Sequence, residues 1–195
     1  MRRPGAAEKP TTMLFLLKRT VPTALGALLI LTALGWALRW WRGDQATPLH
    51  FAPEPVLLGV AVGGGVLVSD ALIHGALLLV FGDAYRKRHV ELAAVFRGQT
   101  LAAIVCGALM AGIGEELVFR GPGTGLAYLL PMALLFGVLH HVRGSLWYAT
   151  VWAVWEGILF ALAVYFTGEL AVTMVAHFLH DLLGFLIFRR VNKGV

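Results

Sequence analysis

Long apolar segments recur along this chain of 195 residues and constrain its fold more than any other feature. A helix that crosses the hydrocarbon core of a bilayer needs about 20 mostly apolar residues. Helices also satisfy their own backbone hydrogen bonds, which a membrane interior requires. Six segments approach this length, at residues 21–41, 56–81, 100–119, 125–141, 146–166 and 170–188. We therefore predict an all-α, polytopic transmembrane helix bundle of about six spans.

The composition agrees with an integral membrane protein, because 58% of the residues are hydrophobic and only 14% are charged. Soluble proteins carry about 25% charged residues. The loops are too short for a soluble domain, so we predict a single membrane domain over residues 1–195, with a motif-bearing core at about 100–190. The first apolar stretch runs on to Trp41, which favours an uncleaved span over a signal peptide.

The basic residues lie between the apolar segments without aromatic residues among them, a pattern typical of membrane topology. We therefore expect a lipid bilayer and no nucleic acid among the partners. With a cytoplasmic N-terminus, 13 of the 16 lysines and arginines are cytoplasmic, and Arg39, Arg42 and Arg120 are not. We expect a plasma (inner) membrane protein with both termini cytoplasmic. Residues 83–99 are either an amphipathic helix on the membrane surface or a solvated loop.

Ionisable residues inside the apolar segments are the candidates for function, because a charge at mid-bilayer costs about 2.5–3.5 kcal/mol on insertion scales. They are Glu115, Glu116 and Arg120 in the third segment, His140 and His141 in the fourth, Glu156 in the fifth, and His177, His180 and Asp181 in the sixth. We interpret Asp70 and His74, in the second segment, as a buried polar pair. Glycines such as Gly63, Gly64 and Gly65 are expected to permit close helix approach.

Helical spacing sorts these residues by face. Glu116 and Arg120 are four residues apart with the acid first, the favourable order for a structural ion pair. Glu115 points about 100° away from Glu116, so the two should not easily serve one small site. Glu115 has no local cation, and this suits a general base. His177 and Asp181 share a face, so the carboxylate can orient or charge the imidazole.

Three motifs carry a family resemblance. EELVFR at 115–120, FGVLH at 136–140 and HFLHD at 177–181 resemble, in order and in segment, the EExxxR, FxxxH and HxxxN/D motifs of the CAAX protease and bacteriocin-processing (CPBP, or Abi) family. The resemblance implies an intramembrane endopeptidase that hydrolyses a peptide bond of a membrane-associated protein or peptide. Its better-understood members look glutamate-dependent, which implies neither a catalytic metal nor another cofactor.

The resemblance also implies roles for six residues. Glu115 and His140 would activate the attacking water, whereas His177 and residue 181 would stabilise the oxyanion. Glu116 and Arg120 would hold the site together. Asp181 stands where the best-understood members carry Asn, and an ionised carboxylate repels an oxyanion. We therefore expect Asp181 to favour the protonated, positively charged form of the His177 imidazole.

Two alternatives stay open at this stage. Histidines and glutamates can bind a catalytic zinc, although the chain has no HExxH pair to place two ligands on one helix face. From a different class, a transporter-like or assembly protein without catalysis would also need a polar interior. Transporters often show inverted repeats, and none is visible in this sequence.

Depth in the membrane is the critical test of the proposed site. A simple six-span topology puts Glu115 and His177 in the outer halves of their helices and His140 near the inner end of its own. At 1.5 Å per residue the separation in depth is roughly 20 Å, too far for the groups to share one water molecule. Re-entry of residues 121–125 into the bilayer, with a shift of the third span, would remove the conflict.

Overall fold

The computed structural model describes residues 20–96, 98–141 and 148–191. In these ranges the chain is helical and has no strand, and five helical segments are long and apolar enough to cross a membrane. They are α2 (Val21–Arg42) with the short η1 (Gly43–Gln45), α3 (Pro53–Ala93), the continuous segment α4–η3–α5 (Leu101–Phe119), α7 (Tyr148–Thr167) and α8 (Leu170–Val191). The apolar α6 (Leu126–Leu139) is shorter. The predicted all-α membrane bundle is confirmed.

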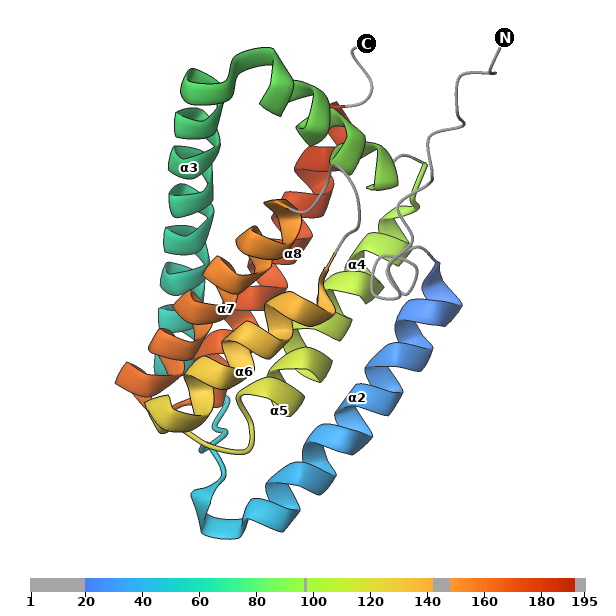
Figure 1. Cartoon of the computed structure of the whole chain (residues 1–195). Helices are drawn as coiled ribbons and strands as arrows, with labels where there is room; N and C mark the ends of the chain where they lie inside the picture. Colours follow the sequence, from blue (N-terminus) through green and yellow to red (C-terminus); the bar gives the residue numbers. More distant parts are fainter. Residues whose placement is uncertain (1–19, 97, 142–147, 192–195) are drawn as a thin grey trace, which may run out of the picture.

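Successive helices run in alternating directions, so that the start of α2 and the end of α8 lie at the same end of the bundle (Figure 1). Which side of the membrane this end faces stays a prediction.

The long α3 bends at Gly82, where the backbone takes φ 51° and ψ −129°. A positive φ is readily adopted by glycine, which explains the position of the bend. The chain then continues as a helix to Ala93 and as the 3₁₀-helix η2 (Ala94–Phe96), across the end of the bundle (Figure 1). The helical interpretation is therefore confirmed for residues 83–96, and the position of this segment at the membrane surface stays a prediction.

Glycines set the distance between α3 and α8. A Cβ atom at Gly63 would lie 2.9 Å from the carbonyl oxygen of Ala176, and one at Gly59 would also meet α8 at 2.7 Å. Gly64 and Gly65 have no such neighbour within 4 Å. The expected close approach is therefore right for Gly63 and wrong for the other two.

The third span is not a continuous α-helix, because a π-helix, η3 (Met110–Glu115), separates α4 (Leu101–Leu109) from α5 (Glu116–Phe119). Such wide turns are rare and often lie at functional sites. Two glycines within η3 let neighbours approach: a Cβ at Gly112 would lie 2.6 Å from Cβ of Phe178 on α8, and one at Gly114 would lie 2.9 Å from Cβ of Leu31 on α2. Glu115, the last residue of η3, is thereby held in the interior.

The expected separation in depth is wrong, because His140 Nε2 lies 4.0 Å from Glu115 Oε1. The expectation assumed that the fourth segment crosses the whole bilayer. With 14 residues α6 is about 21 Å long, shorter than the hydrocarbon core of about 30 Å. Figure 1 also shows α6 strongly inclined to α3, so its C-terminal end stays within the bundle.

The chain that leaves α5 is buried at residues 120–123, whereas Thr124 is partly exposed and Gly125 is exposed. Its carbonyl groups at Gly121 and Pro122 accept hydrogen bonds from Arg39 (3.2 Å) and Arg42 (3.0 Å), and Thr47 N donates to Gly121 (2.9 Å). These contacts supply hydrogen-bond partners for backbone groups that are not part of a helix. Such partners are needed where non-helical backbone lies within a membrane. They also fix the end of α5, on which the site depends.

Candidate active site

Glu115 is a buried carboxylate between two imidazoles. Its residue is 1% exposed, and its Oε1 and Oε2 lie 4.0 Å from His140 Nε2 and 3.9 Å from His177 Nε2, respectively. Neither oxygen accepts a hydrogen bond from the described residues. Both gaps exceed a direct hydrogen bond and suit groups that hold one water molecule between them. The three residues come from η3, the end of α6 and α8, and we call them, with Glu116 and Arg120, the Glu115 site.

His140 is oriented by its own helix. Its Nδ1 donates to the carbonyl oxygen of Phe136 at 2.8 Å, since a carbonyl can only accept. The proton on Nδ1 leaves Nε2 turned towards Glu115. The rings of Phe136 and His140 lie 4.2 Å apart between centroids, so the two side chains share one face of α6.

His177 is oriented by a carboxylate from another helix. Its Nδ1 lies 2.7 Å from Glu116 Oε1, which also accepts from Arg120 Nη1 at 2.8 Å. The Glu116–Arg120 ion pair is thus confirmed, but it is not self-contained. The expectation that Glu115 and Glu116 serve different places is wrong as well. An imidazole presents its nitrogens on opposite sides, so two carboxylates about 100° apart on one helix can each face one nitrogen.

Arg120 is fully buried and anchors this arrangement. Its Nη2 donates to the carbonyl oxygen of Gly157 on α7 at 3.1 Å, and its Cζ lies 4.8 Å from the ring centroid of Phe136. Cation–π contact of this kind compensates a guanidinium that has lost its water. Phe136 therefore separates Arg120 from His140 and contacts both.

Asp181 lies near His177 but does not orient it. Asp181 Oδ1 is 3.8 Å from His177 Nε2, beyond a hydrogen bond, and 3.4 Å from His180 Nδ1. The expected contact within α8 exists, whereas the orienting hydrogen bond comes from Glu116. Helical spacing could not predict the contact between Glu116 and His177, because 61 residues separate them.

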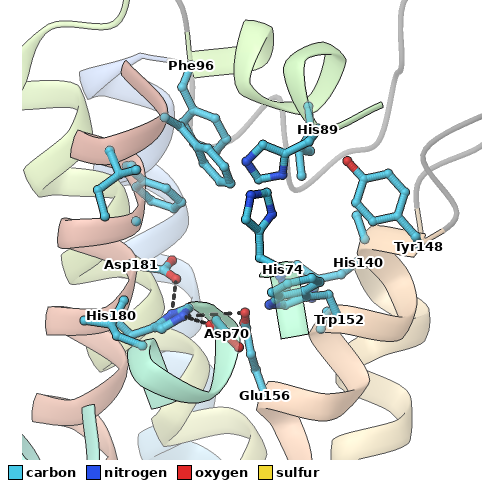
Figure 2. Close-up of a pocket in the computed structure, with 18 of the residues that line it drawn as sticks. Asp70, His74, His89, Phe96, His140, Tyr148, Trp152, Glu156, His180 and Asp181 are labelled. Carbon is cyan, nitrogen blue, oxygen red and sulfur yellow. Dashed lines mark hydrogen bonds and ion pairs between the residues drawn. The ribbon is translucent and has the colours of Figure 1, made fainter. Parts of the chain in front are cut away.

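A cavity of about 410 Å³ adjoins the site between α3, α7 and α8. Its wall includes His140, His177 and Asp181, and most of the remaining wall is apolar or aromatic. Figure 2 shows the imidazoles of His74 and His89 facing each other inside it. We call this cavity the chamber.

A second polar group, the Asp70 cluster, consists of Asp70, Glu156 and His180 on the chamber wall (Figure 2). His180 Nε2 lies 2.7 Å from Asp70 Oδ2 and 3.5 Å from Glu156 Oε1. Glu156, an ionisable residue of the fifth apolar segment, therefore has a histidine as its neighbour. The expected Asp70–His74 pair is wrong, since His74 Nδ1 is bonded to Tyr85 Oη at 3.0 Å.

Residues 97–183 match the family model described as Rce1-like, Type II CAAX prenyl endopeptidase. The CPBP resemblance is confirmed over this segment. The Rce1-like match supports a CAAX-type intramembrane endopeptidase in general, with a protein or peptide substrate, and the apolar helices make the chain an integral membrane protein. No curated protein and no solved structure gives a significant match to the chain. The complete Glu115 site lies inside the matched segment.

Proposed function

We propose that this protein hydrolyses a peptide bond within the membrane by means of a water molecule activated by Glu115 and His140. One observation carries the proposal. Glu115 is buried without a hydrogen bond from the described residues, and the Nε2 atoms of two imidazoles lie within 4.0 Å of its oxygens. A carboxylate held in this way is available to take a proton from water, as a general base must.

The proposed reaction has two steps. Water bonded to Glu115 and His140 attacks the scissile carbonyl carbon, and Glu115 takes the proton that the water loses. The carbon–nitrogen bond then breaks, and Glu115 returns this proton to the departing amine. No further reactant is needed.

His177 is the proposed partner of the oxyanion that forms between these steps. A donor aimed at developing charge stabilises the transition state, provided that it is held in place beforehand. Glu116 and Arg120 supply this support through Nδ1, so only Nε2 can face the oxyanion. His177 must then carry a proton on Nε2. We propose that Asp181, 3.8 Å from that nitrogen, favours the charged ring and does not itself touch the oxyanion.

The family description makes a prenylated C-terminal CAAX sequence the first substrate to test. Such a sequence ends in a lipid-modified cysteine followed by three residues. Apolar and aromatic walls of the chamber suit an apolar segment next to the scissile bond. A leader peptide or a sorting tail is the other proposed substrate class.

The test uses purified protein in liposomes and a panel of quenched fluorescent peptides: prenylated CAAX peptides, the same peptides without the lipid, and leader peptides. Glu115→Gln should lower kcat by at least about 100-fold on any peptide that the wild type cleaves, because a general base is lost. Glu54→Gln, at an exposed glutamate in the first turn of α3, is the matched control and should retain activity.

Size-exclusion chromatography and the unfolding temperature would show that both variants fold. Retained activity in Glu115→Gln would refute the assignment of the base. Stoichiometric zinc that is lost in Glu115→Gln, together with turnover that a chelator abolishes, would favour the zinc alternative.

A further inference from the structure

The Asp70 cluster joins three helices through metal-ligating side chains. Asp70 on α3, Glu156 on α7 and His180 on α8 each offer one donor atom, and these atoms lie within 4.8 Å of one another. Figure 2 shows the three side chains converging at the chamber wall. Nothing in the proposed peptide hydrolysis uses them.

Among the described residues, carboxylates outnumber imidazoles in and around this cluster. Two carboxylates meet a single imidazole, and a third, that of Asp181, lies 3.4 Å from the other nitrogen of the same ring. Asp70 Oδ1 is buried and accepts no hydrogen bond from the described residues. Arg120, the buried cation of the neighbouring site, is already paired with Glu116. A bound cation would offset carboxylates gathered inside an apolar bundle.

The geometry suits a small cation. Zinc binds imidazole nitrogen and carboxylate oxygen at about 2.0–2.2 Å, so two tetrahedral ligands lie about 3.4 Å apart. His180 Nε2 and Glu156 Oε1 are separated by 3.5 Å. His180 Nε2 and Asp70 Oδ2 are closer, at 2.7 Å, and would have to move apart by several tenths of an ångström.

The outer contacts of His180 also match a metal ligand. A histidine that binds a metal through one nitrogen almost always donates the proton on the other nitrogen to a carboxylate, a carbonyl or water. His180 faces the cluster with Nε2 and has Asp181 Oδ1 at 3.4 Å from Nδ1. This is an observation independent of the convergence of the three donors.

We propose that Asp70, Glu156 and His180 bind one divalent transition-metal ion, with zinc as the representative ion. A mixed set of carboxylate and imidazole ligands suits such ions, whereas calcium prefers oxygen ligands alone. Three protein ligands leave a coordination position on the chamber side. The ion is distinct from a catalytic zinc on Glu115, and it ties α3, which lies outside the matched segment, to α7 and α8.

Zinc binding by the purified protein tests this proposal. Protein made without a polyhistidine tag is stripped with a chelator and titrated with zinc chloride by isothermal titration calorimetry. We expect one ion per chain and a higher unfolding temperature with zinc than without it. Calcium at the same concentration should change neither.

Asp70→Asn, Glu156→Gln and His180→Gln should each weaken zinc binding by at least about tenfold. His89→Gln is the matched control, since His89 lines the same chamber outside the cluster, and it should bind zinc as the wild type does. Unchanged binding in the three cluster variants, or absence of binding in the wild type, would overturn the proposal. Loss of binding in Glu115→Gln with full binding in Asp70→Asn would place the ion at the Glu115 site and also overturn it.

X-ray absorption at the zinc edge provides a readout that does not depend on the folding of a variant. In the wild-type protein the Asp70 cluster predicts one imidazole among the ligands. Two imidazoles would indicate His140 and His177 and would contradict the proposal. Because these readouts measure binding, they are independent of whether the protein cleaves peptides.

Discussion

The Glu115 site and the Asp70 cluster both place charged groups inside an apolar bundle, but they balance charge differently. In the Glu115 site each supporting group has a partner from the chain: Arg120 pairs with Glu116, and Glu116 holds His177. One carboxylate, Glu115, is left without a hydrogen bond from the described residues. In the Asp70 cluster several carboxylates surround one imidazole. The comparison indicates that the base proposed for peptide hydrolysis is the acid whose neighbours are already paired with one another.

The two groups also differ in their origin along the chain. The Glu115 site lies within residues 97–183, the segment that matches the Rce1-like family model. The Asp70 cluster takes Asp70 from α3, outside that segment, and Asp181 lies near both groups, 3.4 Å from His180 Nδ1 and 3.8 Å from His177 Nε2. The cluster therefore joins α3 to helices of the matched segment, and its contribution can be measured apart from peptide hydrolysis.

The largest predicted effect concerns the ion pair that balances the Glu115 site. Arg120→Met should lower the free energy of unfolding by about 3–5 kcal/mol, because it leaves Glu116 buried without its cation. Unfolding in mixed detergent micelles, followed by circular dichroism, measures this. Arg86→Met is the control, since Arg86 and Asp83 form an exposed pair that contributes about 0–1 kcal/mol.

The double variant Glu116→Gln/Arg120→Met sharpens this prediction. Removing both charges should cost less than removing Arg120 alone, because no unpaired charge is left in the interior. A double variant that is less stable than Arg120→Met would mean that the pair itself, and not its charge balance, stabilises the bundle.

The next effect concerns the packing that brings η3 against α8. Gly112→Ala should lower the free energy of unfolding by about 1–3 kcal/mol, because the added Cβ lies 2.6 Å from Cβ of Phe178. Gly64→Ala, on α3, adds the same group where no other atom lies within 4 Å and should be close to neutral or slightly stabilising. Equal effects at both positions would show that the close contact of η3 with α8 is not tight in solution.

The sequence predicted features within single helices but not the contacts between helices. Hydropathy predicted the helices, and spacing within one helix predicted the Glu116–Arg120 pair and the shared face of His177 and Asp181. Contacts between helices could not be predicted in this way. Asp70 and His180 are 110 residues apart, and their meeting depends on close glycine contacts between α3 and α8.

Two features of the backbone could not be predicted from the sequence either. Nothing in the run from residue 101 to 119 distinguishes a π-helix from an α-helix, because both bury the same apolar residues. The length of the fourth apolar segment predicted a full crossing, whereas α6 has 14 residues and is inclined. The error of roughly 20 Å in the depth of His140 follows from these local differences.

The smallest predicted effect concerns Asp181, the residue that contacts both groups. If Asp181 acts by favouring a charged His177, Asp181→Asn keeps the shape and changes only the charge, so kcat/KM should fall by less than about tenfold, or about 1.4 kcal/mol. Asp181→Leu, which also removes the polar contact with His180 Nδ1, should cost more. Peptide cleavage in liposomes compares the two variants with the wild type.

Zinc titration of the same variants separates the two roles of Asp181. As an outer contact of His180, Asp181 should influence metal affinity, so Asp181→Leu should weaken zinc binding while Asp181→Asn largely retains it, because an amide oxygen still accepts from Nδ1. A loss of cleavage in Asp181→Asn as large as that in Glu115→Gln would show that the carboxylate charge is essential to catalysis. In that case the Glu115 site would depend on the charge of Asp181 as well. The proposed difference in charge balance between the Glu115 site and the Asp70 cluster would then be wrong.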